Sequence, residues 1–331
     1  MVNDKLQSEV RAGRYLLLAL SFIIYHLPFS SAGAQTLVEL NCENLFDCQH
    51  DEGKEDMEFT PAGERRWSST RYWRKLNSIG QEILSCSEQL PDLVALVEVE
   101  NDTVMRDLTR RSLLRGAGYE YLMTQSPDVR GLDVALLYQP ACFRPLCYDA
   151  LTVPPLENMR PTRDIFYVQG ETVSGDTLHV FIVHAPSRYN GELETRPHRR
   201  QAMTVLLAAL APLAGKNVLV AGDFNDYADS PSLQFLEKAG LHNVTSKAQG
   251  AKGLAKGTYR YHGEWRSIDH VLVSAPLVSR VDSTYINDVP FLLEEEGTYG
   301  GWKPRRTFQG YSYQHGFSDH LPLVVVFSSS K

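Results

Sequence analysis

The segment Gly222-Asp223-Phe224-Asn225 places a carboxylate and an amide directly after an apolar stretch at 217–221. That stretch is rich in β-branched residues and predicts a buried strand, and Gly222 permits a turn where the strand ends. Asp223 and Asn225 are two residues apart, so they project from the same side of an extended chain. Alone, the pair is typical of a turn, and its meaning depends on what lies at other strand ends.

Other predicted strands end or begin beside side chains of the same kinds. The end of one strand lies beside the start of its antiparallel neighbour, so such groups can gather along one edge of a sheet. Random placement of acids, amides and histidines would not favour strand ends so consistently. The residues at these positions are Asn41, Glu98, His184, Asp223, Asn225, Asp269, Asp319 and His320.

The types of these side chains point to phosphate ester hydrolysis. Carboxylates and an amide form an all-oxygen ligand set that suits Mg²⁺, with Mn²⁺ or Ca²⁺ as alternatives, and suits zinc poorly. Such an ion neutralises phosphoryl and leaving oxygens, a carboxylate orients or deprotonates water, and a histidine protonates the leaving group. Each residue alone also has an ordinary structural reading as a turn residue or a core histidine, so the hypothesis rests on the whole set.

The elements expected to position these residues alternate between strands and helices. We find no repeat of fixed period and no linker between domains, which predicts two sheets covered by helices in one domain. His270 follows Asp269 on a strand and is expected to face the other way in a structural role. Helices are predicted at 70–86, 102–115, 193–213 and 231–239. Strands are predicted at 36–40, 93–97, 119–123, 133–138, 165–171, 178–183, 217–221, 268–274 and 321–327. The remaining predictions are a small hairpin at 259–265, irregular segments at 142–158 and 293–313, and a mobile loop at 246–257.

The first 34 residues have the pattern of a secretory signal peptide. A basic start is followed by an apolar run at 15–29 and by Ala32-Gly33-Ala34, a small-residue cleavage pattern. The prediction is a mature domain at 35–331, secreted or periplasmic, with no membrane span after cleavage. An uncleaved N-terminal anchor is the alternative.

Composition is ordinary for a globular protein, with 43% hydrophobic and 22% charged residues. The net charge of −7 comes from no single block and indicates solubility, while leaving room for a local basic cleft. The five cysteines are an odd number without zinc spacing, and buried free thiols are the favoured interpretation. Basic and aromatic residues at 65–75 offer a surface for a nucleic-acid strand, but a solvated face over partly buried rings is the favoured interpretation.

Six motifs in order resemble those of the endonuclease/exonuclease/phosphatase superfamily. The resemblance runs from residue 41 to residue 327 and implies a four-layer α/β sandwich with two packed mixed β-sheets flanked by helices. It identifies the superfamily specifically and says little about the substrate. The motifs are Asn41-Cys42-Glu43-Asn44-Leu45-Phe46, Val97-Glu98-Val99, His184-Ala185-Pro186-Ser187, Gly222-Asp223-Phe224-Asn225, Ser267-Ile268-Asp269 and Ser318-Asp319-His320-Leu321-Pro322.

The resemblance also implies roles for the residues of the site. Glu98 is implied as the main Mg²⁺ ligand, with Asn41 and Asp319 near the ion. Asp223 is implied to activate or orient water, and Asn225 to hold phosphate or orient Asp223.

The histidines and their partners carry further implied roles. Asp269 pairs with His320 and keeps that imidazole charged. His184 resembles the second histidine of the deoxyribonuclease branch, a general acid there, with Asp133 as its candidate supporting carboxylate. Arg163-Asp164 resembles an arginine–acid pair that touches a phosphate.

The predicted function is therefore an exported, Mg²⁺-dependent phosphodiesterase, in the first place a monomeric endonuclease acting on DNA or RNA. A phosphodiesterase or phosphatase acting on a lipid headgroup or another small phosphoester is the second hypothesis. A catalytically silent binding protein of the same fold is the third, and the intact acidic, amide and histidine positions argue against it.

Overall fold

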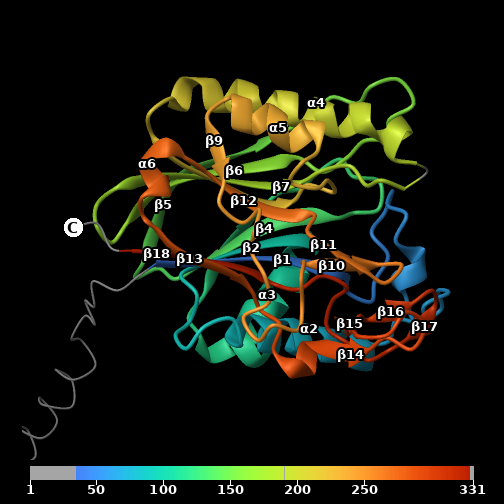
Figure 1. Ribbon diagram of the computed structural model, residues 1–331. Helices are drawn as coiled ribbons and strands as arrows, with labels where there is room; N and C mark the ends of the chain where they lie inside the picture. The colour runs from blue at the N-terminus through green and yellow to red at the C-terminus, as the bar shows by residue number, and fades with distance from the viewer. Residues whose placement is uncertain (1–34, 190, 329–331) are drawn as a thin grey trace, which may run out of the picture. The chain divides into compact units, whose positions relative to one another are not determined.

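Two six-stranded mixed sheets carry the apolar strand segments and pack face to face (Figure 1). The computed structural model describes residues 35–189 and 191–328. The strands of the first sheet, in spatial order, are β13 (Val281–Ile286), β18 (Leu323–Phe327), β1 (Gln35–Leu45), β2 (Leu93–Val99), β4 (Asp133–Tyr138) and β3 (Glu120–Met123). Those of the second are β5 (Phe143–Leu151), β6 (Ile165–Thr172), β7 (Thr177–His184), β8 (Asn217–Asp223), β12 (Asp269–Ser274) and β9 (Leu241–Asn243).

Helices cover the outer face of each sheet, which gives the four layers that the resemblance implies. Figure 1 shows α4 (Glu192–Leu210) and α5 (Pro231–Lys238) above the second sheet, and α2 (Ser69–Leu84) and α3 (Asp102–Arg110) below the first. Leu76, Ile79 and Ile83 follow the helical period along α2 and are fully buried. The Asn101 side chain accepts a hydrogen bond from the Val104 amide and caps α3.

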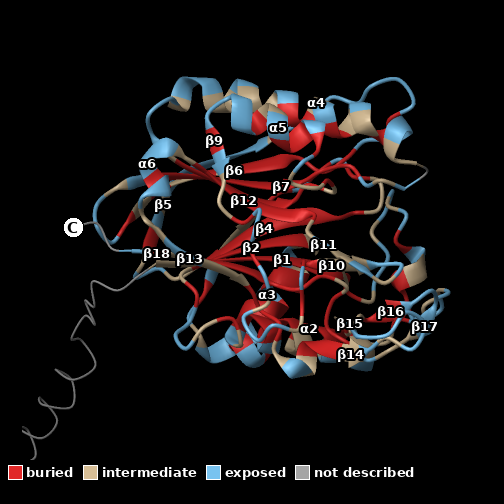
Figure 2. Ribbon diagram, viewed as in Figure 1, coloured by how far each residue is buried: buried red, intermediate tan, exposed pale blue. Residues whose placement is uncertain are grey.

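The strands are apolar on both faces because each sheet is covered on both sides (Figure 2). Leu37 on β1 packs between the two sheets, while its neighbour Val38 packs against the helices. This alternation puts Glu39 and Asn41 on the same face as Leu37, toward the second sheet. Two polar side chains are thereby carried into the space between the sheets.

The strand pairing brings the expected strand ends together. The two pairs β1–β2 and β7–β8 are parallel, and β12 runs antiparallel to β8. In the second sheet His184 pairs with Asp223 in register, and Asp223 pairs with Asp269. The predicted edge therefore exists, and strand pairing alone places three of its residues side by side.

Gly222 is required where β7 and β8 approach each other. Its φ of +143° lies in a region that disfavours other residues, and an added Cβ would lie 1.9 Å from the Val183 carbonyl oxygen. The close approach aligns His184 with Asp223, one residue further along each strand.

Several sequence predictions need correction. The segment 142–158, predicted as irregular, contains β5, an edge strand whose residues are mostly exposed and whose register shifts near Pro145. The polar strand β13 was not predicted. The segment 293–313, predicted as mostly loop, holds two short hairpins, β14 (Leu293–Glu295) with β15 (Trp302–Pro304) and β16 (Phe308–Gln309) with β17 (Ser312–Tyr313).

Other short elements complete the described fold. The predicted small hairpin is confirmed as β10 (Tyr259–Tyr261) and β11 (Glu264–Arg266). The loop predicted as mobile at 246–257 is held by Asp288, whose carboxylate accepts the amides of Lys252, Leu254 and Ala255. The remaining elements are α6 (Ala275–Val278) and the short 3₁₀ helices η1 (Met57–Phe59), η2 (Leu113–Gly116), η3 (Ala211–Leu213) and η4 (Pro290–Leu292).

All five cysteines are free, with Cys42 and Cys86 buried and Cys147 exposed. Within the described residues, no helix is both long and apolar enough to cross a bilayer. The predicted signal peptide at 1–34 lies outside the described residues.

Candidate active site

Three polar contacts join the two sheets at the edge where the strand ends meet. The Asn41 Nδ2 donates to Asp223 Oδ2 at 3.1 Å. The His320 Nδ1 lies 2.8 Å from Asp269 Oδ2. His184 Nε2 lies 3.7 Å from Glu98 Oε1. Residues from opposite ends of the domain sequence thus lie together at one edge, as the sequence predicts.

Backbone strain is concentrated at this edge. Eight non-glycine residues in the described part of the chain have left-handed φ, and four of them are Glu43 (48°), Asn44 (56°), Glu98 (61°) and Asn225 (50°). Glu98 lies where the β2–β4 register shifts, so the bulge turns its side chain out of the strand alternation. Its Oε2 accepts the Asn44 amide at 2.8 Å. Left-handed residues of this kind cost about 1–3 kcal/mol each and commonly mark functional sites.

Asp223 is a buried carboxylate that accepts several hydrogen bonds. The Asn225 amide nitrogen donates to Oδ1 at 2.7 Å, and the side-chain amides of Asn225 and Asn41 donate to Oδ2 at 3.3 and 3.1 Å. Burial and the nearby Asp269 charge raise the pKa of Asp223 to about 7, against the lowering effect of His320. A carboxylate with a pKa near neutrality is well matched to the role of a general base.

Asp269 and His320 form a buried pair between β12 and the segment before β18. The Thr258 hydroxyl also donates to Asp269, and the Tyr259 ring lies 5.0 Å from the imidazole centre. Burial acts to lower the pKa of His320, but the charge and hydrogen bond of Asp269, with Asp319 and Asp223, raise it well above its usual value. This shift favours the protonated form of His320, which is the form that the resemblance implies.

The pKa of His184 is shifted in the opposite direction to that of His320. Burial, with the charges of Arg163, Arg130 and His320, lowers the pKa of His184 well below its usual value. Its Nε2 faces Glu98 and Asp223, and its Nδ1 has no hydrogen-bond partner among the described residues. A neutral imidazole at pH 7 is suited to hydrogen bonding and is a weak proton donor.

The expected contact of Asp133 with His184 is absent from the described structure. Asp133 Oδ1 instead accepts hydrogen bonds from the Thr124 hydroxyl and from the Ser126 hydroxyl and amide, at 2.6 to 2.7 Å. These donors lie in the segment before β4, and they hold the Asp133 carboxylate on the side of the first sheet. Asp133 therefore fixes the 124–133 turn and does not support His184.

Arg163 is buried beside the site but is directed at protein groups. Its Nη1 lies 3.2 Å from Asp128 Oδ2, and its Nη2 donates to the Ala185 carbonyl oxygen at 2.9 Å. The Asn225 side chain donates to the same carbonyl oxygen at 3.1 Å. Arg163 thus holds the chain that comes after His184, while its Nε has no partner among the described residues.

Glu98, Asn41 and Asp319 offer a ligand set that fits a hard divalent cation. Oε1 of Glu98 accepts no hydrogen bond from a described residue, and His184 Nε2 lies 3.7 Å from it. Asp319 uses Oδ2 for Arg306 at 2.9 Å and leaves Oδ1 4.0 Å from His320. Asn41 is less free, because its Oδ1 accepts the Glu43 amide at 2.9 Å. Two carboxylate oxygens without donors are what Mg²⁺ accepts alongside water.

In a different group, Asp223, Asp269 and His320, one ligand atom of each residue lies within 4.8 Å of the others. Here the imidazole nitrogen nearest the acids is already bound by Asp269, and the acids accept amide and hydroxyl donors. We interpret this group as acid–base machinery rather than as the cation site.

Three residues of the site were not predicted. Arg306 lies between Asp319 and Glu43, with Nε 3.4 Å from Glu43 Oε1. Burial, and then Asp319, raises the pKa of Glu43 to about 7. Glu39 is fully buried between the sheets with both oxygens unpaired among the described residues. An acid inside the apolar run 36–40 is a readable signal for Glu39, but the glycine-rich segment around Arg306 shows no periodic pattern.

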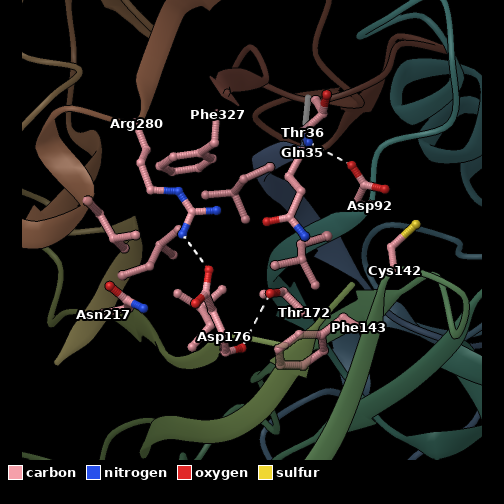
Figure 3. A pocket seen from close by; sticks show the side chains of 15 residues that line it. Gln35, Thr36, Asp92, Cys142, Phe143, Thr172, Asp176, Asn217, Arg280 and Phe327 are labelled. Carbon is pink, nitrogen blue, oxygen red and sulfur yellow. Dashed lines mark hydrogen bonds and ion pairs between the residues drawn. The ribbon is translucent and has the colours of Figure 1, made fainter. Parts of the chain in front are cut away.

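An enclosed cavity lies at the opposite end of the same strands (Figure 3). It is lined by Gln35, Phe143, Asn217, Arg280 and Phe327 among others, and Arg280 Nη1 lies 3.0 Å from Asp176 Oδ2 across it. Its free volume is about 30 Å³, which holds about one water molecule. The cavity is too small for a phosphoester and lacks the site's acids and histidines.

The comparisons with known proteins agree with the family and the fold expected from the sequence. Residues 36–329 match the model of the Endonuclease/Exonuclease/phosphatase family. A family protein from Bacteroides thetaiotaomicron superimposes with a TM-score of 0.59 at 15% identity, covering 90% of this chain and 98% of that chain. A mannosyl-6-phosphatase of that organism gives 0.57 at 15%, covering 88% and 99%. The human Nocturnin catalytic domain with bound sulfate gives 0.54 at 18%, covering 90% and 95%. No curated protein matches the chain.

The opposite charge states of the two histidines can be measured directly. We expect ¹⁵N NMR of the imidazoles to show His320 protonated at pH 7.5 and His184 neutral, because Asp269 stabilises the charge on one and burial opposes it on the other. Asp269→Asn should lower the His320 pKa. The protonation of His320 stabilises the fold below the unfolded-state pKa of about 6.5, and this stabilisation is lost as pH rises through the folded-state pKa. Two histidines titrating together near pH 6.5 would contradict the assignment.

Proposed function

The chain belongs to the endonuclease/exonuclease/phosphatase family, whose members are phosphoesterases, and from this premise we propose that it is an exported, Mg²⁺-dependent phosphodiesterase acting on nucleic acid. The observation that carries the proposal is a charged His320–Asp269 pair beside a carboxylate, Asp223, whose pKa is about 7. Both lie next to the oxygen ligands Glu98 and Asp319, so acid–base groups and cation ligands converge on one edge.

Each residue of the site has a role suited to its surroundings. Glu98 and Asp319, with Asn41, would hold the cation, which supplies charge neutralisation for the phosphoryl and leaving oxygens when bound. Asp223 accepts a proton from the attacking water, and the Asn225 amides keep its carboxylate oriented. His320, charged, stabilises the negative charge that grows on the phosphoryl oxygens.

We assign His184 a different role from the general acid that the resemblance implies. Its lowered pKa leaves it neutral at pH 7, so it presents a hydrogen-bonding nitrogen toward the space between Glu98 and Asp223. A neutral imidazole donates a hydrogen bond to an anionic oxygen without repelling the cation bound nearby. This role orients the phosphate and needs no proton transfer.

A small or lipid phosphoester is the second candidate substrate. The exposed residues Tyr261, Tyr299 and Trp302 lie where the β10–β11 hairpin contacts β15 and the segment before it, an aromatic feature that the sequence does not reveal. The Tyr261 ring is 62% exposed and is followed by His262, whose Nδ1 lies 3.0 Å from the Tyr299 hydroxyl. Such rings can stack on a base or a sugar and can also contact a membrane interface.

The experiment that tests the function assays the mature chain with Mg²⁺ against single-stranded DNA, RNA, sphingomyelin, a generic phosphodiester and a generic phosphomonoester. We expect hydrolysis of nucleic acid and of the generic diester, abolished by EDTA and by Glu98→Gln, because the ligand set is made of oxygen atoms. Full activity in EDTA would refute metal dependence. Hydrolysis confined to the phosphomonoester or to sphingomyelin would assign the second candidate.

The proposal that the protein is exported rests on the pattern of the first 34 residues. We expect the protein recovered outside the cytoplasm to begin near Gln35, because the Ala32-Gly33-Ala34 pattern places cleavage there. Intact-mass measurement of the secreted protein reads the terminus directly, and a mature form that retains Met1 would rule out this prediction.

His320 and Asp269 should behave as one unit in catalysis. Losing one preorganised donor to a developing charge commonly lowers the rate by about 10²- to 10³-fold, so His320→Ala and Asp269→Ala should each lose about that much. The double variant should be little worse than the worse single variant, because Asp269 acts through the imidazole.

Turnover and thermal melting of the three variants are the measurements, with His270→Ala as the control at the neighbouring position. His270 is also buried, but its Nε2 contacts the Asp226 carbonyl at 3.0 Å on the other side of the sheet. Losses that multiply in the double variant would argue against the coupling, and near-normal turnover in His320→Ala would remove His320 from the site.

A further inference from the structure

A basic hollow lies between the segment before α2 and the β16–β17 hairpin. Its volume is about 390 Å³. Arg65 joins its two sides, because its Nη1 donates to the Gly310 carbonyl oxygen at 3.1 Å and its guanidinium lies 4.8 Å from the centre of the Phe308 ring. We call this feature the arginine hollow; the residues that line it include Glu64, Arg65, Arg66, Arg71, Tyr313 and His315.

The arginine hollow carries more positive charge than its own carboxylates balance. Arg65 is paired with Glu58 at 2.8 Å, but Arg66 and Arg71 have no carboxylate partner among the described residues. The Arg71 Nη1 donates to the Arg65 carbonyl oxygen at 2.5 Å, and its guanidinium lies 4.5 Å from the centre of the Tyr313 ring. Glu64 is the one acid among the described lining residues. Unpaired arginines in a protein of net charge −7 favour an anionic ligand.

Arg66 lies in a tight turn, and its guanidinium is available to bind such a ligand. Its backbone φ is +48°, an unusual value for arginine, and its amide donates to the Gly63 carbonyl oxygen at 2.9 Å. Its exposed side chain makes no hydrogen bond or ion pair with another described residue. The tight turn thus presents a free guanidinium, the group that best matches a phosphate.

The structure also divides the basic and aromatic residues at 65–75 into two sets. Trp67 and Tyr72 are buried in the core, in line with the favoured interpretation of the sequence. Lys75 is not on a solvated face: it is buried, and its ammonium donates to the Thr307 hydroxyl at 2.6 Å. Arg66 and Arg71 face the hollow instead of being scattered over the surface.

The hollow is fixed rigidly to the candidate active site. The Glu43 carboxylate accepts the Thr307 amide at 2.5 Å and the Phe308 amide at 3.3 Å, so it anchors the chain that leads into β16. One residue earlier, Arg306 contacts Asp319 at 2.9 Å. The hairpin that forms one side of the hollow therefore begins beside a residue bonded to a candidate cation ligand of the site.

We propose that the arginine hollow binds a phosphate group of a nucleic-acid strand, away from the bond that is hydrolysed. The inference rests on the proposed function and specifies its substrate. Arg66 and Arg71 supply the charge that tracks the backbone, and the Tyr311 ring, 61% exposed at the tip of the hairpin, supplies a face on which a base can stack. None of the described residues that line the hollow is a candidate cation ligand or acid–base residue of the site.

The test separates binding at the hollow from turnover. Binding of a fluorescein-labelled single-stranded oligonucleotide is measured by anisotropy in EDTA, where no hydrolysis is expected, for the wild-type mature chain, Arg66→Glu and Arg200→Glu. Arg200 is an exposed arginine on α4, over the other sheet, and its reversal changes the net charge equally. Turnover of a generic phosphodiester with Mg²⁺ is measured for the same three proteins.

We expect Arg66→Glu to weaken oligonucleotide binding about tenfold or more, which corresponds to one charge-assisted hydrogen bond, and Arg200→Glu to change it less than about twofold. The slope of log Kd against log salt should fall by about 0.7 for one lost phosphate contact. Turnover of the small diester should be equal in all three proteins, since the hollow does not touch the site.

Equal oligonucleotide binding by the two variants, or no binding by the wild-type chain, would overturn the proposal. Arg66-dependent binding to phosphatidylserine vesicles without Arg66-dependent oligonucleotide binding would assign the hollow to a membrane surface and overturn it as well. Failure of the proposed function is a separate result, since it appears as an absence of nucleic-acid hydrolysis with Mg²⁺ whatever the binding shows.

Discussion

The ion pair between Asp269 and His320 is the interaction on which the site depends. Asp223, Asp269 and Glu39 are each at most 2% exposed, and removing several carboxylates from water at one place is costly unless a cation accompanies them. His320 is the buried cation that the described structure places among them. Burial, with the charges of Asp269 and Asp223, raises the pKa of Glu39 well above its usual value, which favours the neutral acid and reduces the charge that His320 must balance. The proton on His320 therefore contributes to the fold as well as to the proposed chemistry.

The same edge is also where the two sheets are held in register. The core between the sheets is apolar and packs without directional bonds. It therefore fixes the distance between the sheets better than the lateral position of one sheet relative to the other. Hydrogen bonds are directional, and the one from Asn41 to Asp223 sets the first sheet against the second at the point where catalysis would occur. Strain at Glu98 and Asn225 is tolerated because these surrounding contacts over-determine the backbone.

Periodic features of the fold can be predicted from the sequence, whereas features that depend on tertiary context mostly cannot. The strands at 93–97, 133–138 and 217–221 are recognisable because they are apolar on both faces, and the residues at their ends are then found together as expected. β5 and β13 were missed because exposed edge strands lose the apolar pattern. The role expected for Asp133 was wrong because a local turn supplies donors that the spacing does not reveal. Arg306 was missed because its position depends on contacts with Glu43 and Asp319, which are distant in the sequence or unmarked by any periodic pattern.

The position of β18 in the first sheet determines when, during folding, the candidate site is completed. This last strand of the described chain lies inside the sheet, between β13 and β1, and pairs Phe327 with Gln35. Asp319 and His320 come shortly before it, so the docking of β18 brings both residues to the site and places His320 against Asp269 of the other sheet. Pairings between distant parts of a chain form late, because the entropy cost of closing a long loop comes before the stabilising contact forms. A growing chain consequently carries every other site residue yet has no complete site until β18 has emerged from the ribosome.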